Sequence, residues 1–333
     1  MEYVTLGKTG LKISRLGFGG IPIQRVDAAA TTKLVKAMAE KGMNYIDTAR
    51  GYTVSESYLG EALEGLRDKF VLATKSMART KEAMAKDIDI SLGNLRTDYI
   101  DLYQVHNPGL KDLDTVTAPG GALEALLEAK EAGKIGHIGL TAHSVEVFEK
   151  ALTFPWVETI MFPYNIVESQ GEELIAKCKE QNVGFIAMKP IAGGNLDDTT
   201  LALRYIVNNP DCTIVIPGMG SAEEVRQNSS DEVFLPLSDE DKAECTKIAR
   251  ELGSEFCRRC GYCAPCPQGI NIPSNFLFAN YLRKYGLADW AKDRYATLPK
   301  NATDCVKCGI CETRCPYNLP IRAMLEKVAK DMA

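Results

Sequence analysis

Short apolar runs alternate with stretches of helical periodicity along most of the chain. Between residues 15 and 228, eight runs rich in β-branched and aromatic side chains are each followed by a stretch in which apolar residues recur every three or four positions. Strict alternation of strand and helix predicts a parallel sheet, and eight repeats are the number that closes an α/β fold of the (β/α)8 or TIM barrel type. The predicted strands cover residues 15–20, 45–49, 70–75, 99–106, 137–142, 159–165, 184–190 and 213–218. The clearest helices cover residues 31–41, 55–66, 80–95 and 171–180.

An open, doubly wound sheet is the alternative arrangement of the same elements. Such a sheet usually carries G-x-G-x-x-G after its first strand when it binds a dinucleotide. Here the first strand ends in Gly17-Phe18-Gly19-Gly20, which lacks that spacing and therefore favours the barrel. A hairpin over residues 3–14 is expected to cap the barrel bottom, and a capping box at residues 238–241 predicts a last helix that ends at Gly253. We therefore expect a barrel domain over residues 1–253 and a separate domain over residues 254–333.

Composition and charge narrow the class of protein. Of the 333 residues, 45% are hydrophobic and 25% are charged, which is typical of a globular protein with a substantial core. A net charge of -5 opposes binding to nucleic acid or to anionic membranes, and no apolar run approaches the roughly 20 residues that span a bilayer. The first residues do not form a leader pattern, so we expect a cytoplasmic location, in which the 11 cysteines stay reduced.

Polar side chains stand at or just beyond the ends of neighbouring predicted strands. Asp47 lies at the end of the second strand with Tyr52 in the following loop, Lys75 ends the third strand, and His106 ends the fourth. Each residue alone has an ordinary structural explanation, as a loop aromatic, a solvated strand end or a hydrogen-bonded histidine. In a barrel, however, these strand ends meet at the rim that carries active sites. There a lysine ammonium makes a tyrosine a usable proton donor, a buried aspartate keeps the lysine charged, and a histidine can donate to a carbonyl oxygen.

The segments around these four residues resemble the aldo-keto reductase family. The resemblance extends to about residue 252 and rests on Asp47-Thr48-Ala49 with Tyr52 and Ser55-Glu56, on Ala73-Thr74-Lys75, and on Tyr103-Gln104-Val105-His106. It implies an NAD(P)-dependent oxidoreductase that interconverts the carbonyl and alcohol forms of a small molecule. It also implies that Tyr52 gives a proton to the carbonyl, that Lys75 lowers the pKa of Tyr52, that Asp47 holds Lys75, and that His106 orients the substrate.

The same resemblance implies a set of dinucleotide contacts, several of which depart from the family pattern. Thr141-Ala142 stands where the family has a Ser-Asn pair, Met161 replaces a glutamine, and Met188 replaces the aromatic that stacks on the nicotinamide. The expected set is Gly20, Asp47, Thr141, Asn165, Met188, Pro190, Gly194, Gly218, Ser221, Glu224 and Asn228.

The adenosine end of the predicted site bears on the choice between NAD and NADP. Members that prefer NADP commonly carry Lys and Arg where this chain has Gly218 and Glu224. A carboxylate repels a 2′-phosphate but accepts a hydrogen bond from a 2′-hydroxyl, so NAD is favoured. The alternative is that Ser221 and Glu224 only form a capping box at the start of a helix.

Eight of the 11 cysteines crowd into two motifs at residues 257–267 and 305–316. The second reads C-x2-C-x2-C-x3-C-P, and the first shortens the last gap by one residue. In such runs three cysteines bind one [4Fe-4S] cluster and the fourth binds the other cluster. This rule predicts one cluster on Cys257, Cys260, Cys263 and Cys315, and a second on Cys305, Cys308, Cys311 and Cys266. The scattered Cys178, Cys212 and Cys245 are interpreted as small buried hydrophobic residues.

A zinc site is the alternative for these thiols, because paired C-x2-C motifs also build all-thiolate zinc sites. Four consecutive thiols ending in Cys-Pro, twice, favour iron-sulfur clusters. The intervening residues 275–285 and the segment around Trp290 have helical character, which resembles the α-helical ferredoxins. A barrel followed by such a ferredoxin-like domain is similar to the iron-sulfur branch of the aldo-keto reductases.

The two chemistries do not couple directly. Nicotinamide transfers two electrons at once whereas a cluster takes one, and the chain shows no signature of a flavin that could stand between them. We therefore expect the clusters to stabilise the fold of residues 254–333 or to bind an electron-carrying protein partner. Two alternatives stay open: an electron-transfer protein or nucleotide-sensing scaffold whose barrel is not an efficient reductase, and a dehydrogenase coupled to ferredoxin.

Overall fold

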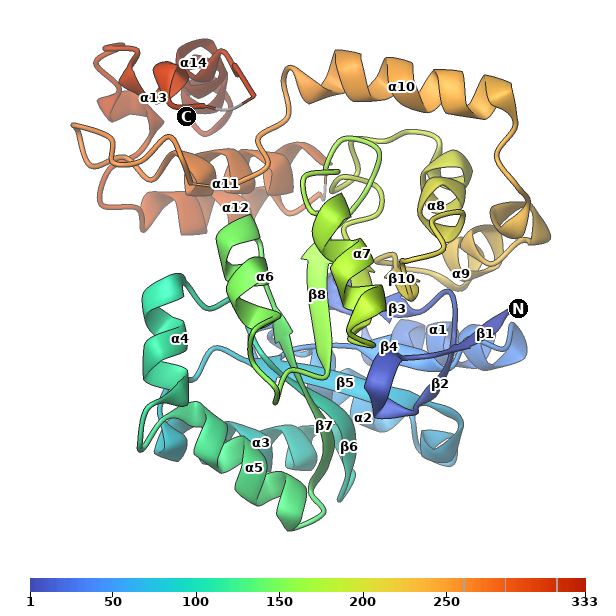
Figure 1. Cartoon of the computed structure of the whole chain (residues 1–333). Coiled ribbons are helices and arrows are strands. Elements are labelled where there is room, and N and C mark those ends of the chain that lie inside the picture. Colours follow the sequence, from blue (N-terminus) through green and yellow to red (C-terminus); the bar gives the residue numbers. More distant parts are fainter. Residues whose placement is uncertain (260, 285, 316) are drawn as a thin grey trace. The chain divides into compact units, whose positions relative to one another are not determined.

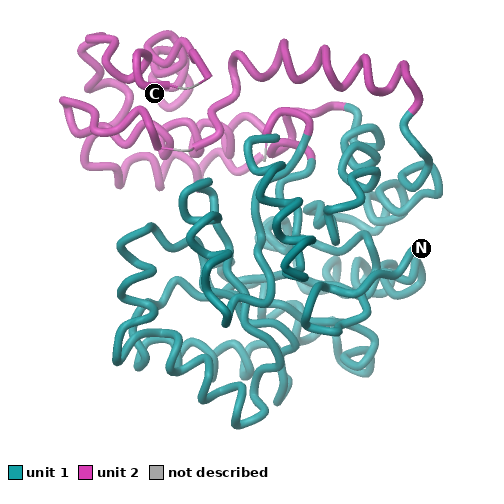
Figure 2. Tube along the Cα trace, in the orientation of Figure 1, with its two compact units in different colours: residues 1–165, 169–190, 198–237 teal, residues 166–168, 191–197, 238–333 magenta. Residues whose placement is uncertain are grey.

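The computed structural model describes residues 1–259, 261–284, 286–315 and 317–333. The chain forms two compact units, which Figure 2 draws in two colours. The first unit comprises Met1–Asn165, Ser169–Pro190 and Asp198–Leu237, and the second comprises Ile166–Glu168, Ile191–Asp197 and Ser238–Ala333. The predicted cluster ligand Cys260 lies outside the described residues.

The first unit is an eight-stranded parallel barrel. Each strand pairs with the next in chain order, and parallel bridges from Leu16 to Val215 and from Gly19 to Gly218 join the first and last strands. The eight predicted strands and the barrel are thereby confirmed. The strands are β3 (Phe18–Gly19), β4 (Tyr45–Asp47), β5 (Val71–Ser76), β6 (Ile100–Val105), β7 (Ile135–Thr141), β8 (Thr159–Pro163), β9 (Gly184–Met188) and β10 (Ile214–Ile216).

Helices connect the strands on the outside of the barrel (Figure 1). Several of them begin at side-chain caps; for example, Asp27 accepts from the amide of Ala30 and Thr80 accepts from the amide of Ala83. The helices are α1 (Ala28–Glu40), α2 (Ser55–Ala62), α3 (Lys81–Leu95), α4 (Leu110–Thr117), α5 (Ala122–Glu131), α6 (Val145–Ala151), α7 (Glu172–Glu180), α8 (Thr199–Val207) and α9 (Ala222–Asn228). Short 3-10 turns are η2 (Ile21–Arg25), η3 (Arg67–Lys69) and η4 (Asp231–Phe234).

The barrel is filled by side chains rather than hollow. Its interior cluster includes Tyr45, Leu102 and Ile186 from the strands. The predicted hairpin is present as β1 (Tyr3–Thr5), the 3-10 turn η1 (Gly7–Thr9) and β2 (Lys12–Ser14), and it adds Leu6 and Ile13 to this interior cluster. The hairpin therefore closes the end of the barrel at which the strands begin.

The second unit is mainly helical and has a small core of its own. The core contains residues such as Ala279, Ala291 and Leu325, and α11 packs against α12 and α14. The predicted capping box is formed by Ser238 and Asp241, and the helix that it starts ends at Gly253, as expected. The contacts group this last helix with the second unit, and the predicted domain boundary at residues 253–254 stays a prediction. The helices are α10 (Asp239–Gly253), α11 (Ile272–Lys284), α12 (Ala288–Ala296), η5 (Ala302–Asp304), α13 (Ile310–Thr313) and α14 (Ile321–Asp331).

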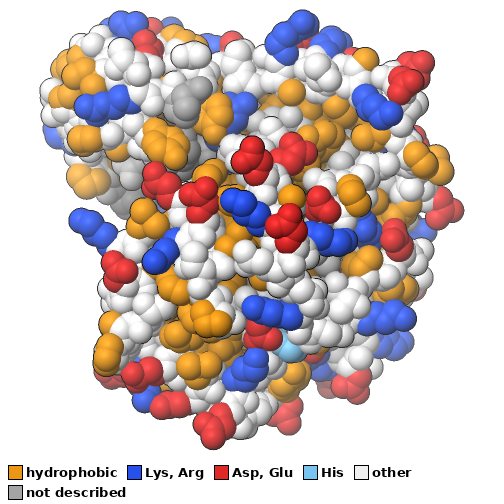
Figure 3. Space-filling model, viewed as in Figure 1, with side chains coloured by type: hydrophobic (Ala, Val, Ile, Leu, Met, Phe, Trp, Pro, Cys, Tyr) orange, Lys and Arg blue, Asp and Glu red, His pale blue; other side chains and the backbone are white. Residues whose placement is uncertain are grey.

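The surface mixes charges of both signs. On the face drawn in Figure 3, acidic and basic side chains are interspersed with apolar ones. In the part of the chain that the structure describes, none of the helices combines the length and the apolar character needed to cross a membrane.

Candidate active site and cysteine motifs

Three neighbouring strands bring the predicted polar residues to one rim of the barrel. Asp47 is the last residue of β4, Lys75 lies next to the end of β5, and His106 directly follows β6. The register pairs Lys75 with Gln104 on β6. Because parallel strands end at the same rim, their side chains converge there.

A buried ion pair is the centre of this rim. The Lys75 ammonium donates to Oδ1 of Asp47 and, at 2.8 Å, to the carbonyl of Thr48. The second carboxylate oxygen of Asp47 accepts from Nε2 of Gln104 at 3.0 Å. Only 2% of the Lys75 side chain and 3% of the Asp47 side chain are exposed, so each charge depends on the other for its partner.

Burial and pairing act in opposite directions on these two groups. Burial lowers the pKa of Lys75, and the negative charge of Asp47 opposes this shift. Burial raises the pKa of Asp47, and the positive charge of Lys75 opposes that shift in turn. Each ion thus supplies part of the stabilisation that water no longer gives to the other.

Tyr52 faces this pair from the loop between β4 and α2. The loop is fixed by backbone hydrogen bonds from Tyr52 to Ala49, at 3.0 Å, and from Ser55 to Tyr52, at 2.8 Å. The Lys75 amine lies 4.9 Å from the centre of the Tyr52 ring, and the His106 ring meets it edge-on at 6.2 Å between centroids. The structure thus brings Tyr52, Lys75, Asp47 and His106 to one rim of the barrel.

His106 is a neutral group in this setting. Burial and the positive charges of Lys75, Arg79 and Lys189 lower the pKa of His106 from 6.5 to about 3. Its Nδ1 atom is buried and has no hydrogen-bond partner among the described residues. A neutral imidazole with an unused ring nitrogen is suited to hydrogen bonding with a ligand.

A second buried carboxylate supports the loop that carries Tyr52. Glu56 on α2 is 1% exposed and accepts from Arg50, Thr74, Ser91 and Asn94. These donors belong to the loop after β4, to β5 and to α3. The network therefore ties the start of α2 to two neighbouring elements.

Gln104 is a site residue that sequence reasoning did not identify. It is fully buried on β6 and holds one oxygen of Asp47. Its position two residues before His106 places both side chains on the same face of the strand. This spacing of two residues was the feature of the sequence that could have indicated Gln104. Its role becomes clear only from the register, which pairs Gln104 with Lys75.

The predicted dinucleotide residues are spread along the barrel rim and the loops that follow. Thr141 ends β7 and accepts from the amide of Asn107 at 2.9 Å. Asn165 follows β8, is fully buried, and donates to the carbonyl of Lys189 at 2.9 Å. Met188 ends β9 with a partly exposed side chain, and Pro190 lies two residues beyond it.

The remaining predicted contacts fall into three places. The amide of Gly20 donates to the carbonyl of Asp47 at 2.7 Å, and Gly218 bridges to Gly19. Ser221 caps α9 and Asn228 ends it. Gly194, in contrast, lies in the segment Ile191–Asp197, which belongs to the second unit.

Glu224 is engaged in local structure. Its Oε2 accepts from the amide of Gly220 at 2.6 Å, and its own amide donates to the Ser221 hydroxyl at 3.2 Å. This is a capping arrangement of the kind that the sequence left open as the alternative. Arg226 pairs with Glu223 at 2.9 Å on the surface.

The two cysteine motifs have residues of positive φ at two corresponding positions. Arg259 and Lys307, each two residues after the first cysteine of its motif, have φ values of 58° and 59°. Gly261 and Gly309, each four residues after that cysteine, have φ values of 86° and 80°. For residues other than glycine, the left-handed backbone conformation is strained, and it persists only where the surrounding structure imposes it. The matched turns therefore indicate two copies of one ligand-binding loop.

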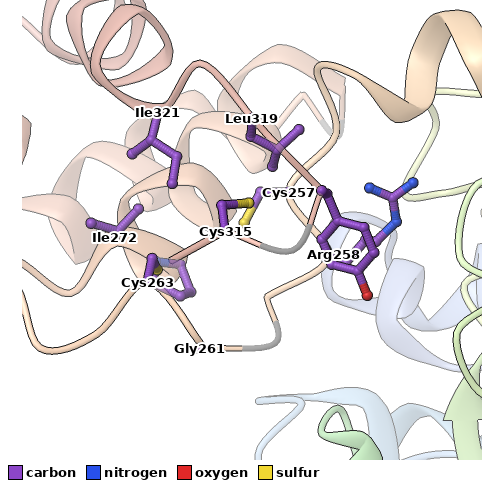
Figure 4. Close-up of a pocket in the computed structure, with 10 residues that line it drawn as sticks. Cys257, Arg258, Gly261, Cys263, Ile272, Cys315, Leu319 and Ile321 are labelled. Carbon is purple, nitrogen blue, oxygen red and sulfur yellow. The ribbon is translucent and has the colours of Figure 1, made fainter. Parts of the chain in front are cut away.

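Thiols from both motifs line one pocket. Cys257 and Cys263 from the first motif and Cys315 from the second line this pocket, which is partly open to solvent. Figure 4 shows the three side chains around this space, with Ile272, Leu319 and Ile321 as apolar walls and the Arg258 guanidinium pointing away from the thiols. These three cysteines are predicted ligands of the same cluster, and the fourth, Cys260, lies outside the described residues.

The other predicted ligands lie in the same unit. Cys311 is buried, Cys266 and Cys305 are partly buried, and Cys308 is exposed. Among the described residues, no three His, Cys, Asp or Glu side chains converge as ligands of a single metal ion. The scattered cysteines are buried as predicted, and burial raises the pKa of both Cys178 and Cys212 to about 12.

Comparisons with known proteins agree with both parts of the chain. The model of the aldo/keto reductase family matches residues 15–201, and the model of a 4Fe-4S dicluster domain matches residues 256–320. L-galactose dehydrogenase of Arabidopsis thaliana is 29% identical over 283 residues, which cover 68% of this chain and 87% of that protein. Aldo-keto reductase YhdN of Bacillus subtilis is 32% identical over 201 residues, which cover 55% of this chain and 59% of that protein. The solved holo form of the aldo-keto reductase AKR11C1 from Bacillus halodurans matches with a TM-score of 0.66 and 27% identity, covering 75% of this chain and 96% of that one.

Proposed function

Because the chain belongs to the aldo/keto reductase family and carries a 4Fe-4S dicluster domain, we propose that it is an NAD(P)-dependent oxidoreductase that interconverts a carbonyl and an alcohol. The proposal rests on one observation. A lysine ammonium buried with its aspartate lies 4.9 Å from the centre of the Tyr52 ring, on the rim where His106 also lies. These contacts support a role for Tyr52 as proton donor to a carbonyl oxygen.

In the proposed reaction Tyr52 is the proton donor. As the substrate oxygen gains negative charge, the Tyr52 hydroxyl gives it a proton and becomes a phenolate. The nearby Lys75 ammonium stabilises that phenolate by charge attraction in a site of low polarity. Asp47 keeps Lys75 charged, and Gln104 holds the second oxygen of Asp47, so that the carboxylate stays directed at the lysine.

His106 has a different part in the proposal. Because its pKa is about 3, the ring is neutral at ordinary pH and cannot serve as the acid. A neutral ring donates one N–H to the substrate oxygen and so orients the carbonyl toward Tyr52. It also adds no second positive charge next to Lys75.

The dinucleotide supplies a hydride when it is bound. The Thr141 hydroxyl and the Asn165 amide fit the hydrogen-bonding groups of a carboxamide, and the thioether of Met188 offers an apolar surface to the ring. Gly20, Asp47, Pro190, Gly194, Gly218, Ser221, Glu224 and Asn228 complete the proposed contacts. NAD is favoured over NADP, because Glu224, in the first turn of α9, stands where members of the family that prefer NADP commonly carry a cation for the 2′-phosphate.

The proposed clusters lie on the two cysteine motifs. Cys257, Cys260, Cys263 and Cys315 would hold one, and Cys305, Cys308, Cys311 and Cys266 the other. The thiols around the apolar pocket fit such a group. When bound, the clusters supply single-electron redox chemistry and a covalent staple for the surrounding fold. Cysteine motifs that bind iron-sulfur clusters need reduced thiols, which a reducing compartment maintains, so we propose a cytoplasmic location.

A Tyr52→Phe variant tests the proposal. A panel of carbonyl compounds is screened with NADH and NADPH, and the best pair is used to compare wild type and variant. Loss of the proton donor is expected to lower kcat about 10³-fold while the Kd for the dinucleotide stays unchanged. Tyr99→Phe is the matched control, because Tyr99 precedes the start of β6, away from the rim. Unchanged turnover in Tyr52→Phe would favour the nucleotide-sensing scaffold instead.

A coupled electron-transfer function is the second candidate, favoured by the exposure of Cys308 in the second motif. An exposed ligand brings a cluster close to a protein partner. Adding NADH to the anaerobic protein distinguishes the two functions. Bleaching of the cluster absorbance would show a relay and support the electron-transfer function, whereas unchanged absorbance supports the reductase with clusters that do not exchange electrons with the nucleotide.

A further inference from the structure

The cations inside the two cysteine motifs bind different parts of the chain. In the second motif, Lys307 pairs with Glu326 on α14 at 2.6 Å. In the first motif, the corresponding Arg259 pairs with Glu168, at 3.4 Å. Glu168 belongs to the three-residue segment Ile166–Glu168, which is part of the second unit although it lies about 90 positions earlier in the chain. The second motif is therefore bound to a helix that lies near it in the sequence. The first motif is bound to a segment of the same unit that comes much earlier in the chain, directly after Asn165.

Arg258 strengthens this tie through the backbone. Its Nε donates to the carbonyl of Val167 at 2.9 Å, and its NH1 donates to the carbonyl of Gly253 at 3.1 Å. Its guanidinium also lies 4.0 Å from the centre of the Tyr317 ring, beyond the last cysteine of the second motif. Arg258, a residue of the first motif, thus contacts both the segment 166–168 and Tyr317, which follows the second motif.

The contact made by Arg259 is buried. Glu168 is fully buried, and 13% of the Arg259 side chain is exposed. A buried carboxylate is strongly destabilised when its cation is removed, so the segment is held in the position that keeps this pair together. Arg259 has a positive φ and lies between Cys257 and Cys260, which are predicted cluster ligands.

A second segment that follows a barrel strand also belongs to this unit. Asn280 on α11 donates to the carbonyl of Gly193 at 3.2 Å and accepts from Asn195 at 3.2 Å. Both partners lie in Ile191–Asp197, the segment after β9. The segments after β8 and after β9 therefore both belong, by their contacts, with the cysteine motifs.

We propose that the first cysteine motif is a latch for the segment 166–168, with Arg258 and Arg259 as positioning residues for dinucleotide binding. The segment continues directly from Asn165, which the proposed function places against the nicotinamide, and to that extent the latch rests on that function. A bound cluster fixes the backbone on both sides of the two arginines, and the arginines fix the backbone that follows Asn165. Binding of the cluster and binding of the dinucleotide are then thermodynamically coupled, so each stabilises the other.

Arg259→Ala is the test, with Lys307→Ala as the matched control. Lys307 has the same place in its motif, the same φ and its own carboxylate partner, but it does not contact the segment 166–168. Arg259→Ala is expected to raise amide hydrogen exchange in residues 166–168 about tenfold and the Kd for the dinucleotide about tenfold. Lys307→Ala should leave both quantities as in wild type.

Glu168→Gln serves as a second variant that leaves both cysteine motifs intact. It removes the charge of the partner and should reproduce both effects with iron content equal to wild type. The latch is wrong if Arg259→Ala and Glu168→Gln exchange like wild type in residues 166–168, or if Lys307→Ala raises exchange there equally. If the wild type binds no dinucleotide, the proposed function fails, whereas the exchange comparison still decides on the latch.

Discussion

The barrel rim and the cysteine motifs organise reactive side chains in different ways. At the rim, Lys75, Asp47 and Gln104 project from strands whose neighbours fill a continuous apolar core. Lys75 and Asp47 pair with each other and Gln104 donates to Asp47, without any bound group, whereas Oε1 of Gln104 has no hydrogen-bond partner among the described residues. The chemistry of the rim is therefore organised by the fold itself.

The cysteine motifs lack such a scaffold. Except for Cys311 on α13, their described thiols stand on loops, some of whose residues have positive φ, and the surrounding helices share a small core. Small domains of this kind commonly need a metal or a cross-link to fold. The comparison teaches that the barrel should keep its structure without iron, whereas the domain around the motifs should not.

Removal of iron is expected to have the largest effect. Anaerobic chelation, or a Cys311→Ser variant, should abolish the amide protection of α11 to α14, because the cluster is part of that fold. The strands β4 to β6 should retain their protection. Hydrogen exchange with mass spectrometry measures both regions in one sample. If the amides of α14 stay protected from exchange in the iron-free protein, the two regions do not differ in their dependence on iron.

Breaking the buried ion pair is the corresponding experiment on the barrel. Lys75→Met leaves Asp47 buried without its cation and should cost about 3–5 kcal/mol of unfolding free energy. Adding Asp47→Leu should restore most of that stability without restoring turnover. Unfolding is followed by the fluorescence of Trp156 in a Trp290→Phe background, so that only the barrel reports. Lys242→Met, which breaks an exposed pair with Asp239, is the control and should change nothing measurable.

Much of the barrel was predictable, because its signals are local. Alternating runs gave the strands, and the rule that strand ends meet at one rim grouped Lys75 with His106 although 31 positions separate them. The cysteine spacing likewise identified a likeness to ferredoxins from short segments alone. Such patterns repeat within a few residues and need no knowledge of distant contacts.

Two of the unpredicted features depend on distant contacts, and the third depends on local geometry. Gln104 is one polar residue in a strand, and its role appears only when the register sets it beside Lys75 and Asp47. Nothing in the sequence near Glu168 indicates that Arg259 is its partner. Glu224 could be interpreted as a ligand or a cap, and its contact with Gly220 is a matter of local geometry.

Acidification should weaken the barrel through His106. Its folded pKa of about 3 lies below the ordinary value of 6.5, so the unfolded chain binds the extra proton first. Stability should therefore fall as the pH drops below 6.5 and stop falling near 3. By about pH 4.5 the loss should be about 2 kcal/mol, less than the full linkage because the ring is partly exposed. His106→Gln should flatten this part of the pH profile in urea unfolding, and an unchanged profile would contradict a depressed pKa.

The smallest effect is expected from Gln104→Leu. The change removes the donor to one oxygen of Asp47, which should cost about 1–2 kcal/mol of stability and lower kcat about tenfold, since the carboxylate holds Lys75 less firmly. Thr159→Val is the matched control, because the Thr159 hydroxyl is also buried in the barrel but has no hydrogen-bond partner among the described residues. The control should be neutral or slightly stabilising. Equal losses of kcat in both variants would mean that the rim responds to any change of barrel packing, and that its charges are not held by one another.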